Sequence, residues 1–212
     1  MFKSLVVAPC AALLLMLSPM AAKAAEPIVI KFAHVVADDT PKGKGALLFQ
    51  KLVRQRLAGQ VDVEVYPNST LVGDADEMQA LLDNKVQMLA PSLSKLIEYS
   101  PKLEVFDLPF LFDDDAAVAR FQKREASREL LRSMAGRGIY GLAYWNNGLK
   151  QMTASQPLRN PADAAGLAFR IQPSPVLEAQ FAAVDAKAVR LPFSEVSKAM
   201  QSGTVQGTEG PW

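Results

Sequence analysis

The sequence has 212 residues, a formal net charge of +1 and an apolar fraction of 50%. This length is enough for a hydrophobic core in one or two domains. The balanced charge and the apolar content argue against a disordered chain and against nucleic acid as a partner.

The first 25 residues differ in composition from the rest. Lys3 precedes an apolar run at residues 5–17, and residues 22–24 (Ala-Lys-Ala) form a small-x-small cleavage pattern. The run is too short and too broken to span a bilayer. We therefore expect residues 1–25 to be a signal peptide that is removed on secretion. Cys10, the one cysteine, lies in this segment, so the mature chain is expected to fold without a disulfide.

Strands and helices are predicted to alternate after the signal peptide. Residues 28–33 indicate a buried strand, and Thr40 and Pro41 are suited to the N-cap and first turn of a helix that Gly59 ends. Apolar and polar residues alternate at 61–66, which is typical of a half-buried strand. The other elements expected before residue 148 are helices at 73–82 and about 116–135 and strands at 86–90 and 138–147. This order predicts a mostly parallel sheet with helices on both faces.

Ligands of such sheets bind beyond the carboxyl ends of the strands. The chain leaves the first three predicted strands at residues 34–36, 66–69 and 91–94. We expect these segments to form the lip of a binding cleft. His34 and Ser92 are candidate ligand-binding residues from this lip.

A second part of the chain begins after the turn signal Asn-Asn-Gly at 146–148. A piece rich in proline and asparagine follows at 156–161. We place a first α/β lobe at residues 26–147 and a partial second α/β lobe at 148–212. The elements expected in the second lobe are a strand at 167–171, a helix capped by Ser174, a strand at 187–191, a helix capped by Ser194 and an acidic turn at 207–212.

Arg170 is the strongest single candidate for ligand binding. It alternates with Phe169 and Ile171 in the predicted strand, and its planar guanidinium can donate two parallel hydrogen bonds to a carboxylate. Taken alone, an arginine is more often a salt-bridged surface residue. The two interpretations are an anion clamp and a surface ion pair.

Seven sequence blocks resemble the solute-binding proteins of tripartite ATP-independent periplasmic (TRAP) transporters, most of all their dicarboxylate-binding branch. They occur in family order and span nearly everything after residue 27. The blocks are 31–36 (KFAHVV) with 40–43 (TPKG), 63–68 (VEVYPN), 105–112 (VFDLPFLF), 147–152 (NGLKQM), 166–170 (GLAFR), 191–196 (LPFSEV) and 207–212 (GTEGPW).

The resemblance implies a periplasmic-binding-protein-like α/β fold, with two lobes around a hinge that close on the solute. It implies a periplasmic protein that captures an organic acid anion, with a dicarboxylate favoured, and delivers it to the integral membrane permease subunits of a TRAP transporter. In that family the arginine of the G-L-x-F-R block, here Arg170, pairs with the solute carboxylate. The other ligand-binding residues expected alongside His34 and Ser92 are Lys150, Gln172, Phe193, Glu209, Gly210 and Trp212.

Two positions qualify this expectation. Lys150 supplies a second cation suited to a second carboxylate, although an exposed lysine beside a turn is an equally common occurrence. Gly210 stands where the family commonly has a solute-binding asparagine. Relatives also continue beyond residue 212, so the second lobe is expected to be incomplete and the chain to be marginally stable or to associate through its exposed sheet edges.

The same residues bear on other possible functions. A secreted α/β enzyme is disfavoured because the sequence has one histidine and no Gly-x-Ser-x-Gly elbow, although Glu195 and Glu209 could be imagined as an acid and a base. The run Asp113–Asp115 fits a helix cap better than a calcium loop. We expect no metal and no cofactor. A binding protein that feeds a sensor stays open as an alternative.

Overall fold

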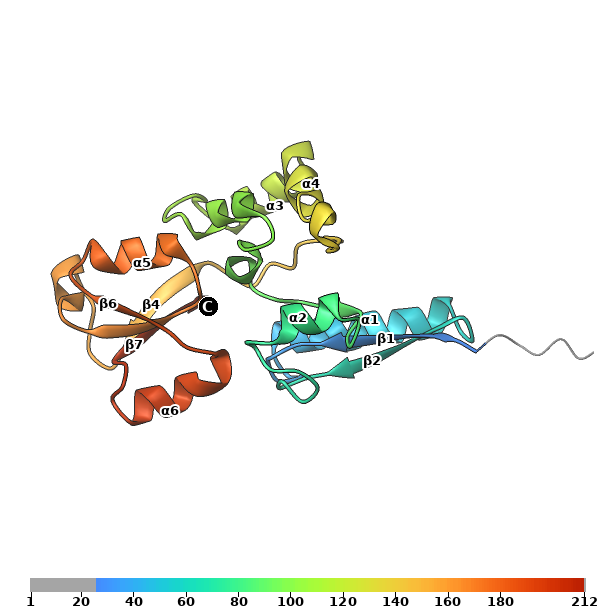
Figure 1. Ribbon diagram of the computed structural model, residues 1–212. Helices are drawn as coiled ribbons and strands as arrows, with labels where there is room; N and C mark the ends of the chain where they lie inside the picture. Colours follow the sequence, from blue (N-terminus) through green and yellow to red (C-terminus); the bar gives the residue numbers. More distant parts are fainter. Residues whose placement is uncertain (1–25, 212) are drawn as a thin grey trace, which may run out of the picture.

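The computed structural model describes residues 26–211. The expected signal peptide at 1–25 and Trp212 lie outside the described residues. Two β-sheets lie toward opposite ends of an elongated molecule, and a helical region lies beside the junction between them (Figure 1). Within residues 26–211, no helix combines the length and the apolar character needed to cross a membrane.

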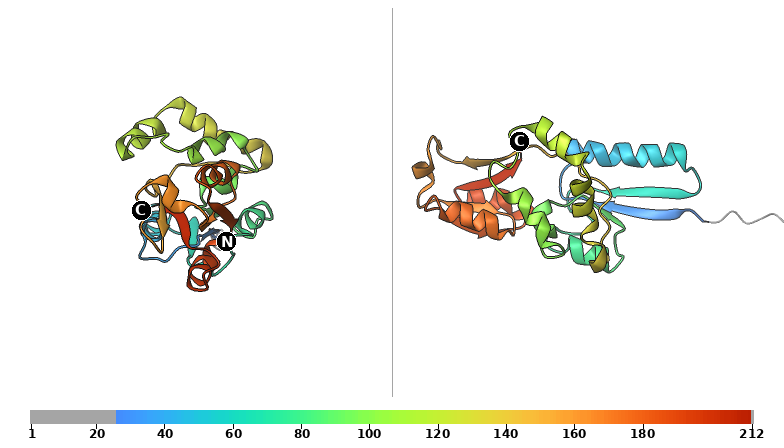
Figure 2. Two further views of the ribbon diagram at one scale, coloured as in Figure 1. Left: turned by 90° about the vertical axis from the view of Figure 1, so that its left-hand side faces the viewer. Right: turned by 90° about the horizontal axis from the view of Figure 1, so that it is seen from above.

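The first sheet is parallel, as predicted. Its strands are β2 (Val61–Tyr66), β1 (Ile28–Ala33) and β3 (Met88–Leu89), in the order β2-β1-β3. Successive side chains of β1 point to opposite faces of the sheet. Phe32 packs with the residues of α1 (Pro41–Arg56), whereas Ala33 packs with those of α2 (Glu77–Leu82). The two helices therefore cover opposite faces of the sheet (Figures 1 and 2).

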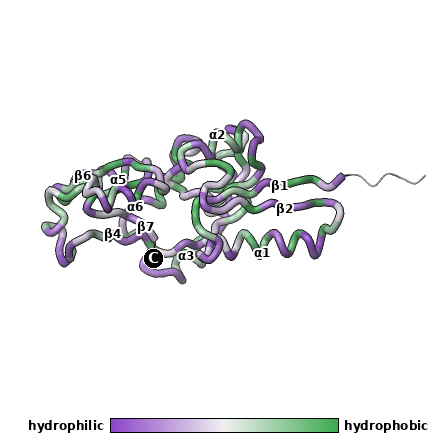
Figure 3. Tube along the Cα trace, turned by 90° about the horizontal axis from the view of Figure 1, so that it is seen from below, coloured by the Kyte–Doolittle hydropathy of each residue, from purple (hydrophilic) through white to green (hydrophobic). Residues whose placement is uncertain are grey.

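The helix α1 begins where the sequence predicts. The Thr40 side chain accepts a hydrogen bond of 3.1 Å from the backbone N–H of Gly43, and Pro41 occupies the first turn. Among the apolar residues of α1, Val53 is buried whereas Leu48 is 55% exposed. Figure 3 shows polar and apolar residues alternating along this helix.

The helix α2 is shorter than predicted. It begins at Glu77, because residues 73–76 form a turn that precedes it. This turn holds the side chain of Asp74 against residues of the second lobe. The partners of Asp74 in this contact lie about a hundred residues further along the chain, so the local sequence does not indicate it.

The predicted helix at 116–135 is two helices, α3 (Asp115–Gln122) and α4 (Glu125–Arg132). Arg124 has extended backbone angles between them, and no glycine or proline marks the break. Phe121 at the end of α3 packs against Phe106 and Phe112, which fixes α3 separately from α4. The predicted cap is confirmed, since Asp114 accepts a hydrogen bond from the N–H of Ala117. Short 3-10 helices at Leu93–Leu96, Pro101–Asp107 and Ala135–Arg137 complete this region.

The strand predicted at 138–147 is wrong. Within the described residues this segment pairs with no strand, and Tyr140 and Leu142 are about 70% exposed (71% and 69%). It is held by side chains instead, because the Tyr144 hydroxyl donates to the carbonyl of Ser127 and Trp145 packs edge-on against Phe32. Alternating aromatic residues therefore mark an extended segment here, but not a strand.

The second sheet consists of the strands β4 (Lys150–Ala154), β7 (Gly207–Pro211), β5 (Ala168–Ile171) and β6 (Lys187–Arg190), in that order. Its strand β5 pairs in parallel with both neighbours, and β4 pairs antiparallel with β7. Ser174 caps α5 as predicted by accepting from the N–H of Leu177. The helices of this lobe are α5 (Pro175–Ala182) and α6 (Val196–Gln201). Two 3-10 helices lie at Pro161–Ala164 and Phe193–Glu195.

Two expectations in this lobe are wrong. The segment predicted as an acidic turn is the strand β7, which fills the position between β4 and β5 and so turns Glu209 toward the interior. Ser194 does not cap a helix, because it lies inside the 3-10 turn Phe193–Glu195 and α6 begins at Val196 without a side-chain cap.

Candidate functional site

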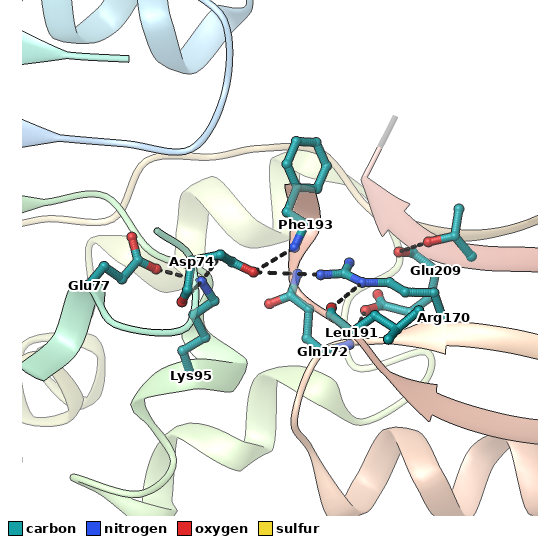
Figure 4. Close-up of polar contacts among 9 residues, drawn as sticks. Asp74, Glu77, Lys95, Arg170, Gln172, Leu191, Phe193 and Glu209 are labelled. Carbon is teal, nitrogen blue, oxygen red and sulfur yellow. Dashed lines mark hydrogen bonds and ion pairs between the residues drawn. The ribbon is translucent and has the colours of Figure 1, made fainter. Parts of the chain in front are cut away.

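Arg170 lies in the strand that occupies an interior position of the second sheet, where both faces are covered, and it is 4% exposed. Its Nε donates a hydrogen bond of 2.9 Å to the carbonyl of Leu191. Burial lowers the pKa of Arg170, while the nearby Glu209 opposes this shift. A guanidinium stays charged even so. A surface ion pair is therefore excluded, and Arg170 is a buried cation at the edge of the gap between the two lobes (Figure 4).

Asp74 of the first lobe faces Arg170 across this gap. Its Oδ2 accepts a hydrogen bond of 2.8 Å from the backbone N–H of Phe193 and lies 3.9 Å from Arg170 Nη2. Its Oδ1 accepts from Lys95 Nζ. One carboxylate thus joins donors from both lobes (Figure 4).

Lys95 and Glu77 extend this cluster into the first lobe. Lys95 Nζ lies 2.6 Å from Glu77 Oε1, and both side chains are buried. Burial, followed by the charges of Arg170 and Lys42, lowers the pKa of Lys95 to about 7. Burial likewise raises the pKa of Glu77 to about 7, against the charge of Lys42. Both shifts have the same main cause, the exclusion of water from this gap.

A second ion-pair group surrounds Lys150 at the start of β4. Lys150 Nζ lies 2.6 Å from Asp107 Oδ1 and 3.6 Å from Glu209 Oε2. It also donates to the hydroxyl of Ser94, which itself donates to Asp107 Oδ1. Lys150 therefore joins the second sheet to the first lobe. The two ion-pair groups together contain the basic residues Lys95, Lys150 and Arg170 and the acidic residues Asp74, Glu77, Asp107 and Glu209.

Gln172 and Glu209 lie beside Arg170. The backbone N–H of Gln172 donates to Glu209 Oε1 at 3.2 Å, which holds this carboxylate between β5 and β7. The side-chain Oε1 of Gln172 is buried and has no hydrogen-bond partner within residues 26–211. An unpaired amide oxygen beside a guanidinium is available to a ligand that donates a hydrogen bond.

Phe193 borders a hollow between the lobes. Its side chain is 47% exposed, and the hollow has a volume of about 440 Å³. Val35, Asn68 and Ser69 line it from the first lobe, opposite Ser194 and Ser197. Val35 and Asn68–Ser69 belong to the lip that the sequence predicts after the first two strands.

The remaining candidate ligand-binding residues are His34, Ser92, Gly210 and Trp212. His34 is buried at the end of β1, and neither of its ring nitrogens has a hydrogen-bond partner in the described part of the chain. Ser92 precedes the 3-10 helix at 93–96 without capping it, and its neighbour Ser94 is the lip serine that bonds with Lys150. Gly210 lies opposite Gln151 on β7. Trp212 lies outside the described residues.

Sequence reasoning missed Asp74, Glu77 and Lys95 as members of this cluster. Lys95 directly follows the predicted lip at 91–94, so its position was the available signal. Asp74 gave no signal, because its partners in the second lobe lie about a hundred residues further along the chain.

The described residues contain no group of three or more metal-ligating side chains. The two carboxylates considered as an acid and a base differ in solvent exposure, since Glu195 is exposed and Glu209 is buried in β7. Asp114, from the run weighed as a calcium loop, caps α3.

Two α/β lobes that face one another across a gap of buried charges define the class of two-lobed ligand-binding proteins. A family model described as bacterial extracellular solute-binding protein, family 7, matches residues 32–212. The chain belongs to this family.

Its relatives include named dicarboxylate-binding proteins. The C4-dicarboxylate-binding periplasmic protein DctP of Shewanella loihica is 54% identical over 188 residues, which are 89% of this chain and 56% of the relative. A TRAP periplasmic solute binding protein from Pseudomonas aeruginosa PAO1 with bound L-malate is 69% identical, with a TM-score of 0.85 over 87% of this chain and 64% of that one.

A TRAP periplasmic solute binding protein from Shewanella oneidensis with bound succinate is 55% identical, with a TM-score of 0.84 over 87% of this chain and 60% of that one. These structures establish the α/β fold of the TRAP solute-binding proteins for this chain. The chain spans a little over half the length of the curated relatives it matches, which fits the expectation of an incomplete second lobe.

Proposed function

We propose that the protein containing this chain is an extracytoplasmic solute-binding protein that captures a C4-dicarboxylate between its two lobes. The observation that carries the proposal is the buried guanidinium of Arg170 at the gap, with Nε held by Leu191 and the remaining N–H groups directed toward the first lobe (Figure 4). A fixed, desolvated guanidinium is a strong and selective donor to a carboxylate.

The remaining parts of the proposal rest on the relatives. Proteins 54% and 52% identical are named C4-dicarboxylate-binding periplasmic proteins, and the solved structures cited above contain malate and succinate. We infer a periplasmic location after removal of residues 1–25 and delivery of the solute to TRAP permease subunits. The protein is proposed to act by binding and not by catalysis.

Within this site, Arg170 binds one carboxylate and Lys150 is the proposed cation for the second. Phe193, Gln172 and Glu209 are proposed to surround the solute from the second lobe, with Gly210 and Trp212 at the end of the chain described. His34 and Ser92 are proposed to contribute from the first lobe, and the boundary between lobes is proposed at 147/148.

The test is a binding assay on two forms of the protein. One is the 212-residue chain, and the other is a hybrid in which the unmatched C-terminal part of the Pseudomonas aeruginosa relative follows Trp212. Succinate and L-malate are expected to raise the melting temperature of the hybrid, because a ligand that binds only the folded state stabilises it. Neutral sugars are expected to have no effect.

Substitution of Arg170 tests whether this residue binds the solute carboxylate. Arg170→Ala is expected to weaken succinate binding about 100-fold, because it removes a desolvated charge from the site. Arg190→Ala is the matched control, since this arginine lies on the adjacent strand β6 and forms an exposed pair with Glu178. Wild-type affinity in Arg170→Ala, or stabilisation by glucose in place of succinate, would contradict the proposed function.

A further inference from the structure

The side chain of Asp74 accepts hydrogen bonds from donors in both lobes. The carboxylate takes a hydrogen bond from the Phe193 N–H in the second lobe and one from Lys95 Nζ in the first, and Arg170 Nη2 lies 3.9 Å away. An ammonium, a backbone N–H and a guanidinium around one carboxylate are the donors a protein uses to bind a free carboxylate. Asp74 thus has the environment of a bound ligand.

The approach of Asp74 to Arg170 is incomplete. Oδ2 lies beyond hydrogen-bond distance of Nη2, and Nε is already bonded to Leu191. Within the described residues the two terminal nitrogens of this guanidinium make no hydrogen bond. A free carboxylate is not tethered to a backbone, so it can approach the guanidinium more closely than Asp74 does.

Asp74 lies in a short turn and not in a helix or strand. Residues 73–76 form a turn ahead of α2, which begins only at Glu77. Lys95 keeps a second carboxylate partner, Glu77 Oε1 at 2.6 Å, when Asp74 moves. Displacement of Asp74 therefore exchanges one anion for another and leaves no cation of the cluster unpaired.

We propose that Lys95 and the backbone N–H of Phe193 complete, with Arg170, the seat for a solute carboxylate, and that Asp74 fills this seat as an internal carboxylate until the solute displaces it. This inference rests on the proposed function and deepens it. It adds Lys95 to the solute contacts and makes Asp74 a competitor that lowers the apparent affinity by the fraction of molecules in which the seat is filled.

The first test asks whether the seat accepts a free carboxylate, and it needs no knowledge of the solute. Asp74→Ala empties the seat in the 212-residue chain, and acetate is then expected to restore part of the lost thermal stability. Acetamide, which has the same shape without the charge, is expected to restore none. Asp76→Ala is the matched control, since this exposed aspartate lies in the same turn and its side chain caps no N–H. If acetate stabilises Asp74→Ala no more than Asp76→Ala, the inference is overturned whether or not the protein binds succinate.

The second test measures competition. In the hybrid, Asp74→Asn keeps the shape of the side chain and removes its charge, so succinate is expected to bind about tenfold more tightly than to the wild type. Asp76→Asn is expected to leave the affinity unchanged. An equal or weaker affinity in Asp74→Asn contradicts the competitor role.

Lys95 is tested in the same assay. Lys95→Gln is expected to weaken succinate binding at least about tenfold, and Lys95→Arg, which keeps the charge, to retain most of it. Unchanged affinity in a folded Lys95→Gln variant would remove Lys95 from the seat while leaving the Arg170 site intact. Absence of any dicarboxylate binding, together with acetate rescue of Asp74→Ala, would instead reject the proposed solute.

Discussion

At the scale of single residues, the environment of His34 has a measurable consequence. The ring is buried next to Phe32, and neither nitrogen forms a hydrogen bond with another described residue. Burial lowers the pKa of His34 from its usual 6.5, and the charge of Lys42 acts in the same direction, against the backbone of Val36 and the charge of Asp38. The folded state therefore holds this imidazole neutral at a pH where the unfolded chain protonates it.

Below pH 6.5 the unfolded state binds more protons than the folded state, so the free energy of unfolding falls as the pH decreases. This one group is therefore expected to make the protein less stable at pH 5.5 than at pH 7.5. Urea unfolding at pH 5.5, 6.5 and 7.5 measures this difference.

His34→Leu is the comparison for this measurement. Its unfolding free energy should vary less between pH 7.5 and 5.5 than that of the wild type, because His34 is the one histidine in the sequence. If the unfolding free energies of the wild type and His34→Leu change equally with pH, the pKa of His34 is the same in the folded and unfolded states, and the prediction is wrong.

At the scale of elements, the strand β7 depends on a glycine for its close packing. A Cβ at Gly207 would lie 2.3 Å from the Phe169 ring and 2.6 Å from the carbonyl of Thr153. Neither neighbour can move easily, since Phe169 is fully buried in the core of the second lobe and the carbonyl belongs to β4. The approach of β7 to both its neighbours thus requires a residue without a side chain.

Gly207→Ala is expected to lower the free energy of unfolding by about 2 kcal/mol, because it overpacks the contact with Phe169. Gly210→Ala on the same strand is the matched control, since a Cβ there meets nothing within 4 Å. Its cost is expected to stay within about 0.5 kcal/mol. Chemical unfolding of the two variants compares them, and equal losses would contradict the packing argument.

At the scale of the whole molecule, ion pairs and a hydrogen bond join the lobes. Lys150 at the start of β4 pairs with Asp107 of the helical region, and Gln180 of α5 donates to the carbonyl of the same Asp107. Together with the contacts of Asp74, these bonds hold the second sheet against the first lobe. The proposed anion site therefore coincides with the interface between the lobes, and the proposed solute would have to exchange places with bonds that hold the lobes together.

Lys150→Ala is expected to lower the free energy of unfolding by about 2 kcal/mol, because it leaves the buried carboxylate of Asp107 without its cation. This loss of stability is smaller than the loss expected for a fully buried ion pair, since the lysine side chain is 31% exposed and water partly screens its charge. Adding Asp107→Asn to the variant should recover part of the loss. Thermal unfolding of the single and double variants checks this, and the absence of any recovery would mean that Asp107 does not depend on Lys150.

The sequence by itself determined the elements whose causes are local. Thr40 and Ser174 cap helices as predicted, and the alternation at 61–66 yields a parallel strand. These features depend on residues within a few positions of each other, so the pattern alone reveals them. The family resemblance likewise points to Arg170, which the structure buries beside Asp74, and its role in solute binding stays a prediction.

Only the tertiary structure decided which charges face each other. The pairing of Asp74 with Phe193 and Arg170 joins residues more than 90 positions apart, and the break between α3 and α4 follows from the packing of Phe121. The segment at 138–147 has the alternation of a strand but pairs with none among the described residues. A strand or an ion pair requires a partner that another part of the chain supplies, and local sequence does not specify where that partner lies.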